Sequence, residues 1–311
     1  MPPSDFPKGA QAQKSSRGNS MRKPKFLLGC HLSIAKGFPA VIDGAKALGI
    51  NAVQVFSHSA RSWRMKPLNP EEAEAFRKRW EDSDVEYTVI HTSYLLNLAS
   101  PDEELWERSL ASLREEVRRA GVLGIPDVVT HLGSHKGAGM ERGIARVAEA
   151  LRRLQDSPEW HRHRVRLLLE LTAGAGDTVG KRFEELAEII EEAGGDERLG
   201  ICFDTCHAFA SGYELRTPEG LEATLRELDC TVGLRRLWLV HLNDSAYPFG
   251  SNRDRHAHIG RGEIGLEGMG LVVNHPCLRE LPFILETPKG ELAGEDADVV
   301  NLRTVRTLRE V

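Results

Sequence analysis

The sequence predicts a (β/α)8 TIM barrel, an α/β fold in which eight parallel strands alternate with helices. Its 311 residues exceed the ~250 of a typical barrel by little more than a short extension. Short β-branched or aliphatic runs alternate with amphipathic segments of helical period, which is typical of repeated strand-crossover units. An open doubly wound sheet shares this alternation, but eight units without a central break favour closure into a barrel.

Each element is expected from its own pattern. The apolar runs predict strands over 25–33, 51–57, 86–92, 127–132, 166–171, 199–205, 236–244 and 281–287. Helical periodicity predicts helices over 70–83, 103–122, 140–154, 180–193, 218–228 and 298–309, with a short crossover near 266–273. The helix at 70–83 turns Glu72, Glu74 and Arg77 to water, and Ser100-Pro101 is a helix-entry signal before 103.

Composition excludes several classes of protein. Lys+Arg 41 against Asp+Glu 46 gives a net charge of −5, so a strongly basic nucleic-acid binder is excluded. No apolar run approaches the ~18 residues of a membrane span. Five cysteines without a C-x-x-C pair encode neither a disulfide framework nor a thiolate zinc site. No secretory signal is visible, so we expect a cytoplasmic protein without membrane association.

The first 24 residues differ from the rest. Residues 1–24 are rich in Pro, Gly, Ser, Gln and Lys, and we expect a disordered basic tail ahead of a barrel domain at 25–311. This tail carries five basic residues and one acidic residue, Asp5, so its net charge is +4. The remaining chain therefore has a net charge of −9. A phosphate-binding site on that acidic remainder needs a source of positive charge.

Histidines and acids stand at the ends of six consecutive predicted strands. In a parallel barrel all carboxyl ends open onto one face, so these side chains would converge on one mouth. Two further pairs, Asp204 with His207 and Asp254 with His256, are compatible with loops that present ligands to a metal. The nine candidate ligands are His91, His131, Glu170, Asp204, His207, His241, Asp254, His256 and Glu286.

The chemistry of this set indicates cations. Imidazoles and carboxylates without a thiolate suit zinc or manganese in open catalytic sites better than a closed structural zinc. The four carboxylates would repel one another if left bare. Three divalent ions would leave the mouth locally positive, which would attract phosphate to an otherwise acidic protein.

Six motifs in one order resemble the signatures of the endonuclease IV family, whose members cut DNA at abasic sites in base-excision repair. The resemblance runs from about residue 26 to 288. The motifs are HTSYLLNL (91–98), ELTAGAG (170–176), FDTCHAFASGY (203–213), HLND (241–244), GSNRDRH (250–256) and LETP (285–288).

The resemblance implies three Zn²⁺ per chain, with manganese as an alternative at one site. One zinc would be held by His91, His131 and Glu170. A second would be held by Glu170, the bridging and catalytic residue, together with Asp204, His241 and Glu286. A third would be held by His207, Asp254 and His256.

The implied reaction is hydrolysis, by a metal-bridging hydroxide, of the phosphodiester 5′ to the abasic deoxyribose. It would leave 3′-hydroxyl and 5′-deoxyribose phosphate ends. The implied substrate is double-stranded DNA containing abasic sites, and the enzyme is expected to be a monomer. Arg61, Tyr94 and Leu95 match the side chains that relatives insert into DNA. An abasic nucleotide has no base to unstack, so flipping it out costs less than flipping an intact one.

Some residues depart from the family pattern, although none of them removes a candidate ligand. Leu171 stands where Asn is usual, Ala175 where Gln is frequent, Thr92 where an acid is common and Ser57-His58 where Lys-Asn is familiar. These departures concern the tuning of the ligands and the loop contacts with DNA.

Two other functions compete. A metal-dependent sugar isomerase or epimerase on a related barrel would leave His207, Asp254 and His256 unexplained. A DNA-damage binding module without catalysis would not need a complete ligand set.

The remaining histidines divide into two groups. His31, His135 and His258 are candidates for phosphate contact or for support of the ligands, whereas His58, His161, His163 and His275 are expected at the surface. We expect Cys202 and Cys206 to be reduced packing residues.

Overall fold

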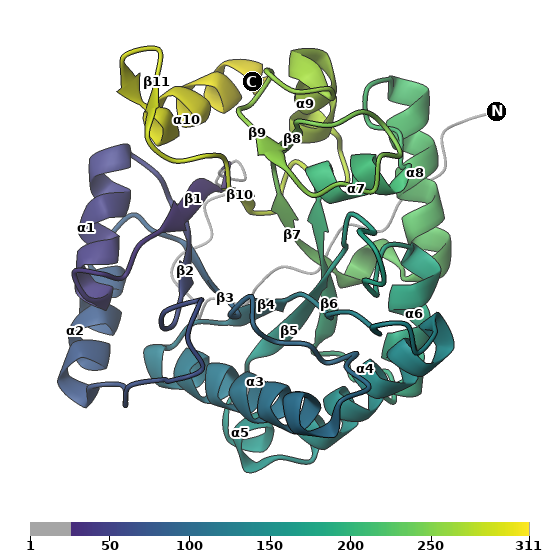
Figure 1. Ribbon diagram of the computed structural model, residues 1–311. Helices are drawn as coiled ribbons and strands as arrows, with labels where there is room; N and C mark the ends of the chain where they lie inside the picture. The colour runs from purple at the N-terminus through teal and green to yellow at the C-terminus, as the bar shows by residue number, and fades with distance from the viewer. Residues whose placement is uncertain (1–25, 311) are drawn as a thin grey trace.

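The computed structural model describes residues 26–310, and within them eight parallel strands close into a barrel (Figure 1). The predicted fold is confirmed, whereas the predicted tail at 1–24 lies outside the described residues. Around the barrel the strand order is β1-β10-β7-β6-β5-β4-β3-β2. Their bounds are β1 (Leu28–Leu32), β2 (Ala52–Phe56), β3 (Tyr87–His91), β4 (Asp127–Thr130), β5 (Arg166–Glu170), β6 (Leu199–Asp204), β7 (Leu237–His241) and β10 (Phe283–Leu285).

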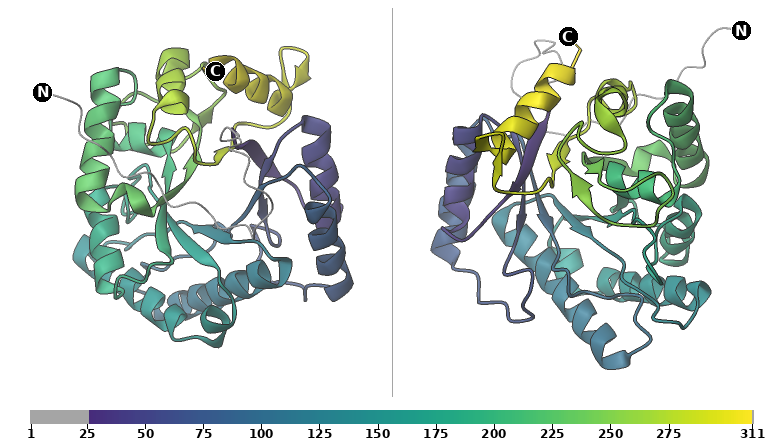
Figure 2. Two further views of the ribbon diagram at one scale, coloured as in Figure 1. Left: turned by 180° about the vertical axis from the view of Figure 1, so that it is seen from behind. Right: turned by 45° about the horizontal axis from the view of Figure 1, so that its top comes forward.

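Helices cover the outside of the barrel. The long ones are α1 (Phe38–Leu48), α2 (Pro70–Glu81), α3 (Glu103–Leu123), α4 (Met140–Gln155), α6 (Phe183–Glu192), α8 (Pro218–Thr231), α9 (Gly265–Asn274) and α10 (Ala297–Leu308). Shorter elements are α5 (Pro158–Arg162), α7 (Thr205–Ser211), η1 (Leu234–Arg236) and the hairpins β8 (Asp244–Ser245) with β9 (His256–Ala257) and β11 (Glu291–Leu292) with β12 (Glu295–Asp296). The first and last strands of the barrel pair with each other, and the C-terminal helix α10 lies beside β1 (Figure 2).

Local sequence signals set the ends of the helices. Asn69 accepts a hydrogen bond from the Glu71 N–H and precedes Pro70, so α2 begins with a side-chain cap and a proline whose missing N–H costs nothing. Asp102 caps α3 by accepting from the Leu105 N–H. That helix ends at Gly124, whose φ of 75° is left-handed backbone that favours glycine.

The barrel interior is apolar in its middle layer and polar at both ends. Residues from alternating strand positions fill that layer, among them Val89, Val129 and Leu168. At the amino ends of the strands, Arg166 binds Asp127 at 2.6 and 2.7 Å, and the Tyr87 hydroxyl donates to the same carboxylate. This buried network closes one end of the barrel and leaves the carboxyl ends as the face available for a site.

Two expectations need correction. The sequence places Asp204 at the end of a strand over 199–205 and is compatible with a loop that presents His207, but His207 lies in α7, which begins directly after β6 because the Asp204 carboxylate accepts from the His207 N–H at 2.8 Å and caps it. His58 was expected at the surface but is buried, with Nδ1 3.2 Å from the Glu116 carboxylate on α3.

Among residues 26–310, no helix combines the length and apolar character needed to span a bilayer.

Candidate metal centre

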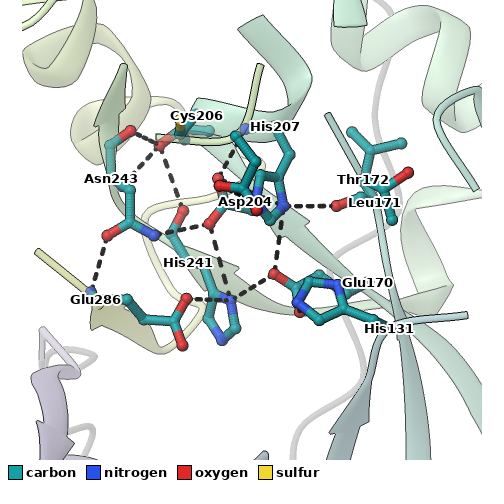
Figure 3. A network of polar contacts seen from close by, with 12 residues as sticks. His131, Glu170, Leu171, Thr172, Asp204, Cys206, His207, His241, Asn243 and Glu286 are labelled. Atoms are coloured by element: carbon teal, nitrogen blue, oxygen red, sulfur yellow. Dashed lines mark hydrogen bonds and ion pairs between the residues drawn. The ribbon is translucent and has the colours of Figure 1, made fainter. Parts of the chain in front are cut away.

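The carboxyl ends of the barrel strands bring the predicted ligands together. His91, Glu170, Asp204 and His241 are the last residues of β3, β5, β6 and β7, and all four are buried. His131 directly follows β4, and Glu286 directly follows β10. Because the strands are parallel, these six side chains meet at one rim, as the sequence predicted. Figure 3 shows five of them, His131, Glu170, Asp204, His241 and Glu286.

Glu170 lies at the centre of this rim and contacts imidazoles with both oxygens. Its Oε2 is 3.0 Å from His91 Nε2 and 3.6 Å from His131 Nε2. Its Oε1 is 3.1 Å from His241 Nδ1 and 3.4 Å from His207 Nδ1 (Figure 3). A fully buried carboxylate with ligand-type nitrogens on both sides has the arrangement of a group shared between two cation sites.

A second group lies on the Oε1 side of Glu170. Glu170, Asp204, His241 and Glu286 each offer one atom, and these atoms lie within 4.8 Å of one another. His241 Nδ1 is 3.3 Å from Glu286 Oε2 and 3.9 Å from Asp204 Oδ2. Three carboxylates converging on one imidazole nitrogen form a strongly anionic pocket.

The third group combines α7 with the segment before β9. Asp254 Oδ1 lies 3.2 Å from His207 Nε2 and 3.7 Å from His256 Nε2. Both of these Nε2 atoms are buried, and apart from their ion pairs with carboxylates they have no further partner among the described residues. A cation between the three residues would give each Nε2 lone pair a partner. Asp254 leaves 53% of its side chain exposed, so this group is open to solvent.

The surroundings of the histidines also fit a cation. Nδ1 of His91 and His207 lies 2.8 Å from the carbonyl oxygens of Thr92 and Leu171, and His256 Nδ1 is 3.1 Å from the Glu286 carbonyl. A carbonyl oxygen only accepts, so each of these nitrogens carries a proton. The opposite nitrogen then faces carboxylates, which would repel its lone pair unless a proton or a metal ion lies between them. Because the acceptors of the His91 and His207 contacts are main-chain oxygens, these contacts do not depend on the side chains of Thr92 and Leu171, which depart from the family pattern.

The pKa shifts describe the same charge balance. Burial raises the pKa of Glu170, but His131 and His241 more than reverse this and hold it well below its usual value. Burial likewise opposes ionisation of Asp254, yet His207 and His256 lower its pKa to about 2. Burial lowers the pKa of His207, but Asp204 and Asp254 outweigh it and place that pKa well above the usual value. The rim therefore favours negative carboxylates with positive charge between them.

Two supporting residues were missed by the sequence analysis. Asn243 donates from Nδ2 to Asp204 Oδ2 at 2.7 Å and accepts from the Glu286 N–H at 2.8 Å. Gln54 contacts His241 and Glu286 through the barrel interior, from β2, which β1 separates from β10. A signal for Gln54 was present, since a single amide interrupts the apolar strand AVQVF.

The predicted DNA-contacting residues lie in two loops that follow β2 and β3. Arg61 is exposed, Leu95 is partly exposed, and Tyr94 exposes 61% of its surface, so Tyr94 is not a core aromatic. Its ring lies 6.2 Å from that of His91. Ser93 ties the two loops together, because its hydroxyl donates to the Ala60 carbonyl at 2.7 Å and accepts from the Leu95 N–H at 3.2 Å.

The other candidates have structural contacts. His135 Nδ1 accepts from the Gly139 N–H, and His258 Nδ1 lies 3.1 Å from the Asn301 amide. Cys202 and Cys206 are buried and unpaired with other cysteines, which agrees with the packing role expected of them. The Cys206 thiol donates to the Arg255 carbonyl at 3.5 Å, and burial raises its pKa.

Comparisons with known proteins agree with this geometry. The family model described as a xylose isomerase-like TIM barrel matches residues 42–304. The chain is 47% identical over 285 residues to the probable endonuclease 4 of Chloroflexus aurantiacus, covering 92% of this chain and 98% of that relative. Over 278 residues it is 46% identical to the probable endonuclease 4 of Methanoculleus marisnigri, covering 89% and 98%.

Solved structures of an endonuclease IV and of a sugar epimerase-like protein are also similar to this chain. Endonuclease IV from Thermus thermophilus superposes with a TM-score of 0.78 at 44% identity, covering 90% of this chain and 98% of that one. A D-tagatose 3-epimerase-like protein superposes with a TM-score of 0.67 at 18% identity, covering 90% and 95%, a likeness of fold alone.

Proposed function

The chain belongs to the endonuclease IV family, and from this premise we propose that it is an abasic-site endonuclease of DNA repair. It hydrolyses the phosphodiester 5′ to the abasic deoxyribose and leaves a 3′-hydroxyl and a 5′-deoxyribose phosphate. The observation that carries the proposal is the buried Glu170 carboxylate, which contacts imidazoles through both oxygens at the open rim of the barrel.

The three ligand groups are proposed to hold three zinc ions, with manganese as an alternative at one of them. His91, His131 and Glu170 form the first group. Glu170 also belongs to the second, with Asp204, His241 and Glu286, and His207, Asp254 and His256 form the third. When bound, such ions activate water near neutral pH and neutralise the charge of a phosphodiester. The buried Nε2 atoms of His207 and His256, which face only carboxylates among the described residues, support this assignment.

The chain's own residues account for the remaining requirements of the reaction. Four carboxylates would hold the proposed metal ions at the rim. The positive charge of these ions attracts a DNA phosphate, although the protein has a net charge of −5. Apolar residues below the rim separate the site from the Asp127–Arg166 network at the other end of the barrel. Substrate therefore approaches only from the face that bears the loops after β2 and β3.

A synthetic duplex with one tetrahydrofuran abasic analogue tests the function. Zinc-loaded protein is expected to nick the damaged strand on the 5′ side of the analogue and to leave an end that a polymerase extends. The same duplex without the analogue serves as the control and should remain intact. Failure of the zinc-loaded protein to nick would overturn the proposal, and turnover of a keto-sugar instead would favour the isomerase alternative.

Damage recognition is proposed to depend on Arg61, Tyr94 and Leu95. Replacement of Arg61 or Tyr94 by Ala should weaken binding to the abasic duplex about tenfold each, because an inserted cation or ring is worth ~1–3 kcal/mol at such a contact. Binding to intact duplex should change much less. Fluorescence anisotropy with both duplexes measures the difference.

A matched control for these variants is Arg226→Ala, which removes an exposed cation from α8. It should leave the preference for abasic DNA unchanged. If Arg61→Ala or Tyr94→Ala weakened binding to both duplexes equally, these side chains would not be reading the damage.

A further inference from the structure

Gln54 lies in the middle of β2 with its side chain fully buried, and it contacts three residues of the rim. Its Nε2 donates to Glu286 Oε1 at 2.6 Å and lies 3.1 Å from His31 Nδ1, while its Oε1 is 2.7 Å from His241 Nε2. We propose that Gln54 is a positioning residue that fixes His241 and Glu286 for metal binding by the second ligand group. This inference rests on the proposed metal sites.

The contacts determine which way the amide points. A carboxylate oxygen only accepts hydrogen bonds, so the nitrogen of Gln54 must face Glu286. Its oxygen then faces His241 Nε2, which must carry a proton in order to donate. In the neutral, metal-binding form of His241 the unprotonated nitrogen is then Nδ1, the atom that faces Glu170 at 3.1 Å and Glu286 at 3.3 Å. One amide thus selects the tautomer of one ligand and holds the carboxylate of another.

Gln54 bridges strands that are not neighbours in the barrel wall. β2 pairs with β1 and β3, whereas His241 and Glu286 come from β7 and from the end of β10, so Gln54 reaches across the interior. An apolar side chain here would leave the His241 N–H and a Glu286 oxygen unpaired in a buried place. A carboxylate would lie against Glu286 and repel it.

His31 holds Gln54 in place from the other side. The second amide hydrogen points to His31 Nδ1, which requires a neutral imidazole. Burial lowers the pKa of His31 to about 3, which agrees with that requirement. The ring of Phe56 packs 4.3 Å from the His31 ring and restricts its movement. His31 therefore supports the ligands through Gln54, which is one of the roles expected from the sequence.

The experiment compares zinc retention by the wild-type protein and Gln54→Met, a variant of similar length that keeps the packing but loses all three contacts. Zinc-loaded protein is titrated with a competing chelator, and the ions that remain per chain are counted. Loss of a partner that orients ligands typically costs 10–100-fold in metal affinity, so one class of ion should be released at correspondingly lower chelator concentration. The other ions should be retained as in the wild type.

Thr88→Val is the matched control. Thr88 is a buried polar residue on the neighbouring strand β3, paired in register with Val53, and its hydroxyl has no hydrogen-bond partner among the described residues. Its zinc retention should equal that of the wild type. If Gln54→Met does not fold, Gln54→Asn, which keeps the amide but is too short for both contacts, is measured instead and should show the same selective loss.

The outcomes separate this inference from the proposed function. If a folded Gln54 variant retained every ion with wild-type affinity, the positioning role would be overturned, even if the wild type nicked abasic DNA. If instead the wild type failed to nick while the Gln54 variant lost one class of ion, the positioning role would stand and the proposed function would fall.

Discussion

Replacing Glu170 with Gln is expected to reduce nicking of the abasic duplex by about a thousand-fold while leaving the barrel folded. Glu170 is buried and contacts four imidazoles through its two oxygens. An amide offers only one oxygen and places an NH2 group towards nitrogens or cations on the other side. Removing one group that stabilises the charge of a transition state typically costs ~2.7–4 kcal/mol, and each ~1.4 kcal/mol is tenfold in rate.

Measurement of DNA binding by the Glu170→Gln variant distinguishes a catalytic role of Glu170 from a structural one. The loops with Arg61 and Tyr94 lie outside the ligand groups, so Glu170→Gln should still bind the abasic duplex. Glu185→Gln is the control, because Glu185 is also buried but only accepts from the N–H groups of Gly180 and Lys181. Equal loss of nicking and binding in Glu170→Gln would argue against the bridging role.

The sequence was sufficient to predict the barrel and the rim because both follow from local patterns. Apolar runs of strand length locate β3 and β5, and the last residue of each is a ligand-type side chain, His91 and Glu170. Parallel closure then brings those ends together whatever the exact boundaries are. The positions of His131 and Glu286, each one residue beyond a strand, illustrate this tolerance.

Contacts that depend on the third dimension could not be predicted. Gln54 reaches His241 across the barrel, and no local pattern reveals a partner 187 residues away. His58 was expected at the surface because polar residues in loops usually are, but Glu116 on α3 provides a buried partner. The helix after Asp204 is not apparent from the sequence, because the Asp204 side chain serves both as the cap of that helix and as a candidate metal ligand.

The second large effect concerns metal removal. Protein stripped by a chelator should not nick the abasic duplex, because among the described ligand residues only protonated imidazoles then supply positive charge beside Glu170, Asp204, Asp254 and Glu286. Protonated imidazoles cannot activate water for hydrolysis as a divalent ion does. Nicking should return when zinc is added, and the stripped protein should unfold at a lower temperature, because a ligand that binds only the folded state stabilises it.

The most direct measurement is a zinc titration of the stripped protein, with bound ions per chain and nicking rate measured on the same samples. Three ligand groups, two of which share Glu170, predict saturation at three ions per chain, with full nicking reached only as the third is bound. Full nicking at one ion per chain, or by protein that holds no metal, would contradict the central claim that this rim is a three-metal hydrolytic centre.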